Sequence, residues 1–90
     1  MRLARHYIIH GRVQGVGFRY FVERQANVEG IHGWVRNLPD GRVEIHAEGE
    51  RESLERFEHH IGHGPSRARV DSVDRTDAAV TAHDAGFSVR

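Results

Sequence analysis

The chain changes from a predicted strand to a predicted helix across Gly11-Arg12-Val13-Gln14-Gly15-Val16-Gly17-Phe18-Arg19. Residues 5–13 place apolar side chains alternately on one face, which predicts a strand with one buried face. From Phe18 onward the apolar residues follow helical spacing, and this stripe consists of Phe18, Phe21, Val22 and Ala26. A strand, a glycine-rich loop and a helix therefore follow one another at the start of the chain.

The rest of the sequence predicts strands at residues 31–38, 42–48 and 67–76, and an amphipathic helix at 50–61. Pro39 and Gly41 mark a turn between the second and third strands. Residues 77–85 are expected to form a loop, and Phe87 and Val89 a short final edge strand. The order β-α-β-β-α-β plus a short fifth strand predicts an α+β fold, a ferredoxin-like α/β sandwich.

That fold has a geometric consequence for the loop and for the second strand. Its first and second strands run parallel, with the third strand between them. Their C-terminal ends should therefore lie at one edge of the sheet, two strand spacings or roughly 10 Å apart. We found no linker or internal repeat, so one domain spanning residues 1–90 is expected.

Composition excludes several classes of protein and of site. The chain has no cysteine and no lysine, so thiolate nucleophiles, Cys-based zinc sites and Schiff-base or Walker lysines are impossible. Positive and negative side chains balance at 13 each, which argues against a nucleic-acid partner. The sequence has neither a signal peptide pattern nor the ~20 apolar residues that a membrane span needs. We therefore expect a cytoplasmic protein without a membrane partner.

The glycine-rich loop could hold an anion without a metal. Gly15 and Gly17 would let backbone N–H groups turn inward, and the start of the helix adds unpaired N–H donors. Arg19, in the first helical turn, carries a permanent charge and can bind two oxygen atoms at once. The same spacing also suits a plain tight connection with a surface arginine, and both interpretations remain open from spacing alone.

Two motifs together resemble those of the acylphosphatase family. Residues 11–19 are similar to its signature Gly-x-Val-Gln-Gly-Val-x-Phe-Arg, and residues 33–44 to Gly-x-Val-x-Asn-x-x-Asp-Gly-x-Val-Glu. The resemblance runs from residue 5 to the C-terminus. It implies the same ferredoxin-like fold and hydrolysis of the carboxyl–phosphate bond of acyl phosphates.

The resemblance also implies roles for individual residues. Arg19 matches the catalytic arginine that binds phosphate, and Asn37 the asparagine that positions the attacking water. The substrate-binding cradle corresponds to Gln14, Gly15, Val16, Gly17 and Phe18. No metal and no cofactor is expected, the partner is a small-molecule acyl phosphate, and the enzyme is expected to be a monomer. From the residues alone, Asn37 could equally cap a β-turn.

Three other interpretations are compatible with parts of the sequence. His59 and His63 have the i,i+4 spacing of two metal ligands, but glycines end the helix there and solvated histidines are favoured. A non-catalytic anion-binding module of the same fold is the main alternative function, because such domains also occur inside larger maturation proteins. The 90-residue length favours a free-standing enzyme. A single-strand RNA binder ranks last, since residues 42–48 contain no aromatic side chain.

Overall fold

The computed structural model describes residues 1–81 and 86–90. The elements in chain order are β1 (Arg2–Arg12), α1 (Phe18–Glu29), β2 (His32–Asn37), β3 (Val43–Glu50), α2 (Arg51–His63), β4 (Arg69–Ala78) and β5 (Phe87–Val89). The predicted element order is confirmed. Strand β4 continues through Ala78, so the loop expected at residues 77–85 begins later than predicted, and residues 82–85 of that loop lie outside the described residues.

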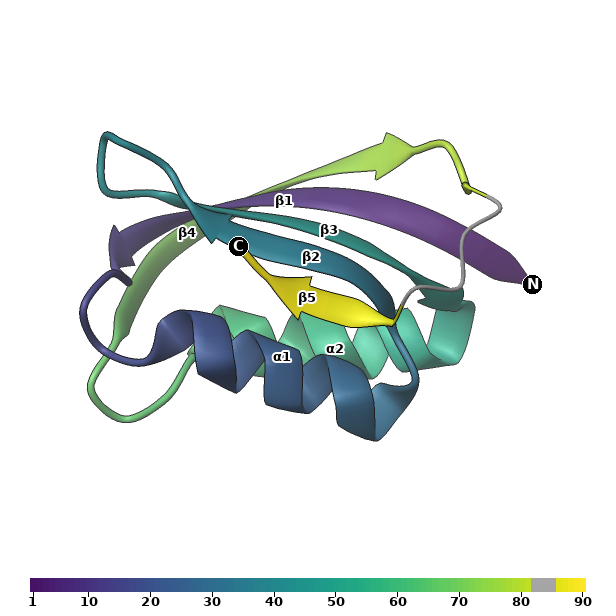
Figure 1. Ribbon diagram of the computed structural model, residues 1–90, viewed down its shortest axis with the longest axis horizontal. Coiled ribbons are helices and arrows are strands. Elements are labelled where there is room, and N and C mark those ends of the chain that lie inside the picture. The colour runs from purple at the N-terminus through teal and green to yellow at the C-terminus, as the bar shows by residue number, and fades with distance from the viewer. Residues whose placement is uncertain (82–85) are drawn as a thin grey trace.

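The strands form one sheet in the order β4-β1-β3-β2-β5. Strand β3 pairs antiparallel with both β1 and β2, and β5 adds to the outer edge of β2 in parallel. Both helices pack on the same face of the sheet, as Figure 1 shows, and no described helix covers the opposite face. This arrangement confirms the ferredoxin-like sandwich, and it places the C-terminal ends of β1 and β2 at the same edge.

The hydrophobic core lies between the sheet and the helices. The alternating residues of β1 and β3 and the helical stripes meet there, and Tyr7, Ile9, Phe18, Val22, Val35, Val43, Ile45, Leu54, Phe57 and Ile61 are all at most 1% exposed. Phe57 of α2 packs its ring against Tyr7 of β1 and Phe87 of β5, with centroids 6.2 and 6.3 Å away. The core therefore connects the inner strand β1 with the short final strand β5.

Gly33 lets β2 approach β3 closely. Its φ is 142°, and a Cβ atom added there would lie 1.9 Å from the backbone oxygen of His46. Its N–H group donates to the carbonyl of Gly86, 3.0 Å away, which fixes the start of β5. No side chain fits at this position without separating β2 from β3.

We expect Gly33→Ala to lower the free energy of unfolding by about 2 kcal/mol or more, because of the backbone clash and the strained φ. Gly62→Ala is the matched control, since an added Cβ there meets no described atom within 4 Å. That helical substitution should be neutral or stabilise by up to ~1 kcal/mol. Urea unfolding of both variants measures the difference, and equal stability of the two would contradict the proposed constraint on β2.

Candidate active site

The connection between β1 and α1 exposes the N-terminal end of the helix. Gly15 and Gly17 have φ values of 73° and 76°, in the left-handed region that favours glycine. Gly17 is the N-cap residue and provides no side-chain cap, and the first turn of α1 contains no acidic residue. The first-turn N–H groups and the positive end of the helix dipole therefore face this loop without a capping carboxylate.

Gln14 holds the loop against the β2–β3 turn. Its side-chain Nε2 donates to the carbonyl oxygens of Leu38 and Arg42, at 2.8 and 3.0 Å. These two carbonyls belong to the chain that directly follows Asn37, the last residue of β2. The loop and the end of β2 are therefore fixed relative to one another by hydrogen bonds from a single amide group.

A small hollow of about 200 Å³ lies between the loop, the first turn of α1 and the end of β2. It is lined by Val13, Gly15, Gly17, Phe18, Arg19, Tyr20 and Asn37. The structure thus brings Arg19 and Asn37 together with part of the predicted loop. The side chains of Gln14 and Val16 do not line the hollow: the Gln14 amide binds the β2–β3 turn, and Val16 packs against the core. Sequence reasoning missed Tyr20, whose only signal was its position beside Arg19 in the first helical turn.

Arg19 is anchored by the main chain at the end of the sequence. Its Nη1 donates to the main-chain oxygen of Arg90, the last residue of the sequence, 2.7 Å away. Within residues 1–81 and 86–90, no Asp or Glu side chain lies within ion-pair distance of Arg19. A guanidinium has five N–H donors, so this single contact orients the group and leaves its other donors for a ligand.

Asn37 contributes a buried acceptor. Its Oδ1 atom is buried and, among the described residues, has no hydrogen-bond partner. Buried polar atoms in folded proteins are nearly always paired, with protein groups or with water. An unpaired amide oxygen in the wall of a hollow marks a place where a water or a ligand donates a hydrogen bond.

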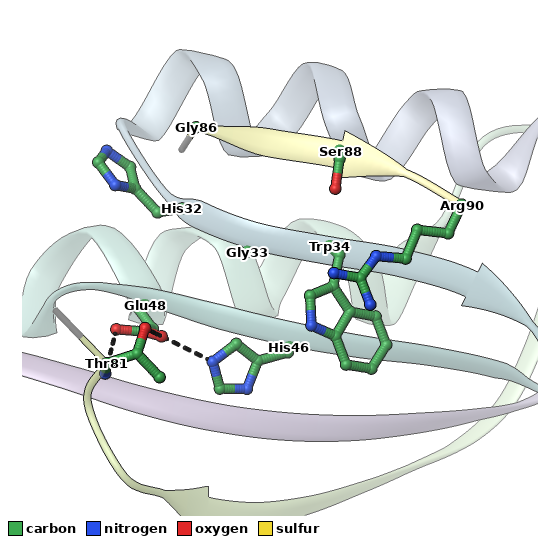
Figure 2. A pocket seen from close by; sticks show the side chains of 9 residues that line it. All are labelled: His32, Gly33, Trp34, His46, Glu48, Thr81, Gly86, Ser88 and Arg90. Carbon is green, nitrogen blue, oxygen red and sulfur yellow. Dashed lines mark hydrogen bonds and ion pairs between the residues drawn. The ribbon is translucent and has the colours of Figure 1, made fainter. Parts of the chain in front are cut away.

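A second and larger hollow of about 430 Å³ lies on the open face of the sheet (Figure 2). Glu48 in its wall is 3% exposed and accepts hydrogen bonds from His46 Nε2 at 2.8 Å and from the Thr81 N–H and hydroxyl at 2.9 and 2.7 Å. Burial alone would raise the pKa of Glu48, but these donors outweigh it and hold the pKa below its usual value. The structure thus pairs His46 with a buried carboxylate.

The aromatic group of the larger hollow is also engaged within the protein. The guanidinium groups of Arg90 and Arg36 lie 4.7 and 5.3 Å from the centroid of the Trp34 ring, and the His46 ring stacks on it at 6.0 Å. These groups therefore contact one another, and among the described residues the larger hollow has no unpaired buried acceptor comparable with Asn37 Oδ1. The smaller hollow is the stronger candidate for catalysis, although the other has twice its volume.

Two further features of the described residues bear on the class of site. Within them, no group of three or more His, Cys, Asp or Glu side chains is arranged to hold a metal ion. The rings of His59 and His63 lie 4.6 Å apart, and Nδ1 of His63 donates to the carbonyl of His59. Over the same residues, no helix is both long enough and apolar enough to cross a membrane.

Comparison with known proteins agrees with this geometry. The family model for acylphosphatases matches residues 5–89. An acylphosphatase of Roseiflexus sp. is 47% identical over 90 residues, covering 99% of this chain and 97% of the relative. The crystal structure of acylphosphatase from Bacillus subtilis superposes with a TM-score of 0.93 at 39% identity, covering 100% of this chain and 99% of that one.

A third similar structure is much longer. Full-length HypF in the phosphate- and nucleotide-bound form matches this chain over its whole length at 30% identity and a TM-score of 0.88, but the match covers only 12% of HypF. The sequence match, the fold and the coverage of whole relatives agree with one another. The chain belongs to the acylphosphatase family.

Proposed function

We propose that this chain hydrolyses acyl phosphates to a carboxylate and inorganic phosphate, and that the reaction takes place in the small hollow without a metal ion. The observation that carries the proposal is the combination of the Arg19 charge and the unpaired Asn37 oxygen beside an uncapped helix N-terminus. The Arg19 guanidinium suits the phosphoryl oxygens, and the Asn37 oxygen suits a water. The family membership supports the same reaction.

The phosphoryl group binds to the loop and to Arg19. Backbone N–H groups of residues 14–18 and of the first turn of α1 donate to its oxygen atoms, and the helix dipole favours its negative charge. The Arg19 guanidinium, oriented by the main-chain oxygen of Arg90, binds phosphoryl oxygens with its remaining donors. These donors neutralise the charge that is spread over the equatorial oxygens in the transition state.

Asn37 positions the attacking water. Its Oδ1 accepts a hydrogen bond from the water and aims the water oxygen at phosphorus. An amide cannot act as a base at neutral pH, so the water proton passes to an oxygen of the substrate's own phosphate. The new water oxygen–phosphorus bond forms as the bond to the acyl oxygen breaks, and the electron pair leaves with the carboxylate. A carboxylate leaves readily, so the site needs no general acid.

The alternative of a non-catalytic anion-binding module makes a different prediction for substrate turnover. We expect the wild-type protein to hydrolyse benzoyl phosphate in the presence of EDTA and to leave a phosphomonoester such as 4-nitrophenyl phosphate intact. An assay that follows both substrates decides between the two. Binding of phosphate without turnover of benzoyl phosphate would favour the binding module, and activity that EDTA removes and a divalent ion restores would exclude the metal-free reaction. A cytoplasmic location, a monomeric state and a single-domain organisation stay predictions.

Arg19→Ala should reduce kcat/KM for benzoyl phosphate by roughly 10³-fold or more and should weaken inhibition by inorganic phosphate as well. Arg19→Lys should also be poor, because an ammonium group cannot reproduce the bidentate contact. Arg24→Ala is the matched control, since Arg24 is an exposed arginine of α1 that does not line the hollow. Steady-state kinetics, with circular dichroism to verify folding, tests this assignment, which near-normal activity of Arg19→Ala would refute.

Asn37→Ala should lower kcat by at least about tenfold, corresponding to ~1.4 kcal/mol of barrier, while phosphate affinity changes much less. The proposed contact is with the water and not with the anion. Calorimetric titration with phosphate gives the affinity, and Asn27→Ala, an exposed asparagine of α1, provides the control. If phosphate binding were lost together with turnover, Asn37 would instead belong to the anion-binding group.

A further inference from the structure

We propose that Tyr20 contacts the acyl group of the substrate and favours acyl phosphates whose acyl group is planar and apolar, such as aroyl phosphates. This inference rests on the proposed function, and it names the substrate class that the same hollow prefers. It assigns a role to a residue that the sequence motifs did not single out.

Tyr20 lies at the rim of the hollow. It is one of the seven lining residues, and its side chain is 62% exposed. Two other apolar lining residues, Phe18 and Val13, are each only 1% exposed. The buried residues of α1 are Phe18, Val22 and Ala26, so Tyr20 does not belong to the core-facing stripe of the helix. Among the large apolar residues that are exposed in the described part of the chain, it is the only aromatic one.

The direction of the reaction places the leaving group near this rim. The water binds at Asn37 Oδ1, which is buried and therefore lies at the inner side of the hollow. In phosphoryl transfer the attacking and leaving oxygens are roughly in line across phosphorus. The acyl oxygen therefore points away from Asn37, toward the solvent-exposed side of the hollow, where the Tyr20 side chain is available.

The size of the hollow also places the acyl group of the substrate near Tyr20. Pockets that enclose whole drug-sized molecules have volumes of roughly 300–1,000 Å³. At about 200 Å³, this hollow suits a phosphoryl group and a water, and an acyl group of any length must extend past its mouth. Gly15 and Gly17, which also line the hollow, carry no side chains, and Cβ atoms added there would meet no described atom within 4 Å. Tyr20 is thus the aromatic surface that an extended acyl group meets, and flat groups stack on it or approach its edge.

The test compares benzoyl phosphate with acetyl phosphate, which share the reacting group and differ in the aromatic ring. We expect Tyr20→Ala to lower kcat/KM for benzoyl phosphate about fivefold more than for acetyl phosphate, which is the scale of one aromatic contact. Tyr20→Phe should keep the wild-type preference, because it retains the ring. Inhibition by inorganic phosphate, which has no acyl group, should not change in either variant.

Val28→Ala is the matched control. Val28 is 73% exposed on the same helix and does not line the hollow, so its substitution should leave the ratio of the two substrates unchanged. If Tyr20→Ala left that ratio unchanged, or lowered activity equally toward both substrates, the assignment of Tyr20 would be overturned. Failure of the wild-type protein to hydrolyse either substrate would instead overturn the proposed function, so the two failures are distinguishable.

Discussion

Strand β3 lies between β1 and β2 and is hydrogen-bonded antiparallel to both, from Ile9↔Val43 on one side to Asn37↔Val43 on the other. Because both neighbours oppose the same strand, they run parallel to each other and end at the same edge of the sheet (Figure 1). The glycine loop follows one of these ends, and Asn37 forms the other. The proximity of the proposed anion donors and the proposed water site therefore follows from strand pairing, and not from any direct contact between Arg19 and Asn37.

Two contacts between distant parts of the chain refine this placement. The Gln14 amide binds two carbonyls of the β2–β3 turn, which sets the distance from the loop to Asn37. Strand β5 pairs in parallel with β2, and the Arg90 N–H group donates to the Val35 carbonyl at 2.8 Å. That contact holds the main-chain oxygen of Arg90 where it accepts a hydrogen bond from Arg19. A short edge strand thus supports the orientation of the arginine on which the proposed reaction depends.

The sequence predicted the element order and the placement of Arg19 and Asn37 at the same edge of the sheet. Both depend on local periodicity and on the topology of one fold. It did not predict the partner of β5, since three residues of alternating pattern are equally compatible with any free sheet edge. It also missed the side-chain contacts across strands, such as His46 with Glu48 and Arg56 of α2 with Glu29 of α1. Such pairs depend on register and helix rotation, which hydrophobic spacing alone does not determine. Tyr20 was missed because an exposed aromatic residue has no distinctive spacing.

The contrast between the two hollows shows that unpaired polar groups indicate a binding site better than volume does. In the larger hollow, the Glu48 carboxylate accepts hydrogen bonds from His46 and Thr81, and the Trp34 ring is in contact with two guanidinium groups. A ligand there would compete with contacts that already exist. In the smaller hollow, a ligand would instead complete contacts that the fold leaves open, beside Asn37 Oδ1 and at the uncapped start of α1. Folding has already removed the Asn37 amide oxygen from bulk water without giving it a partner among the described residues. A water or ligand that donates to this oxygen therefore recovers a hydrogen bond, and the binding free energy is larger than the volume of the hollow suggests.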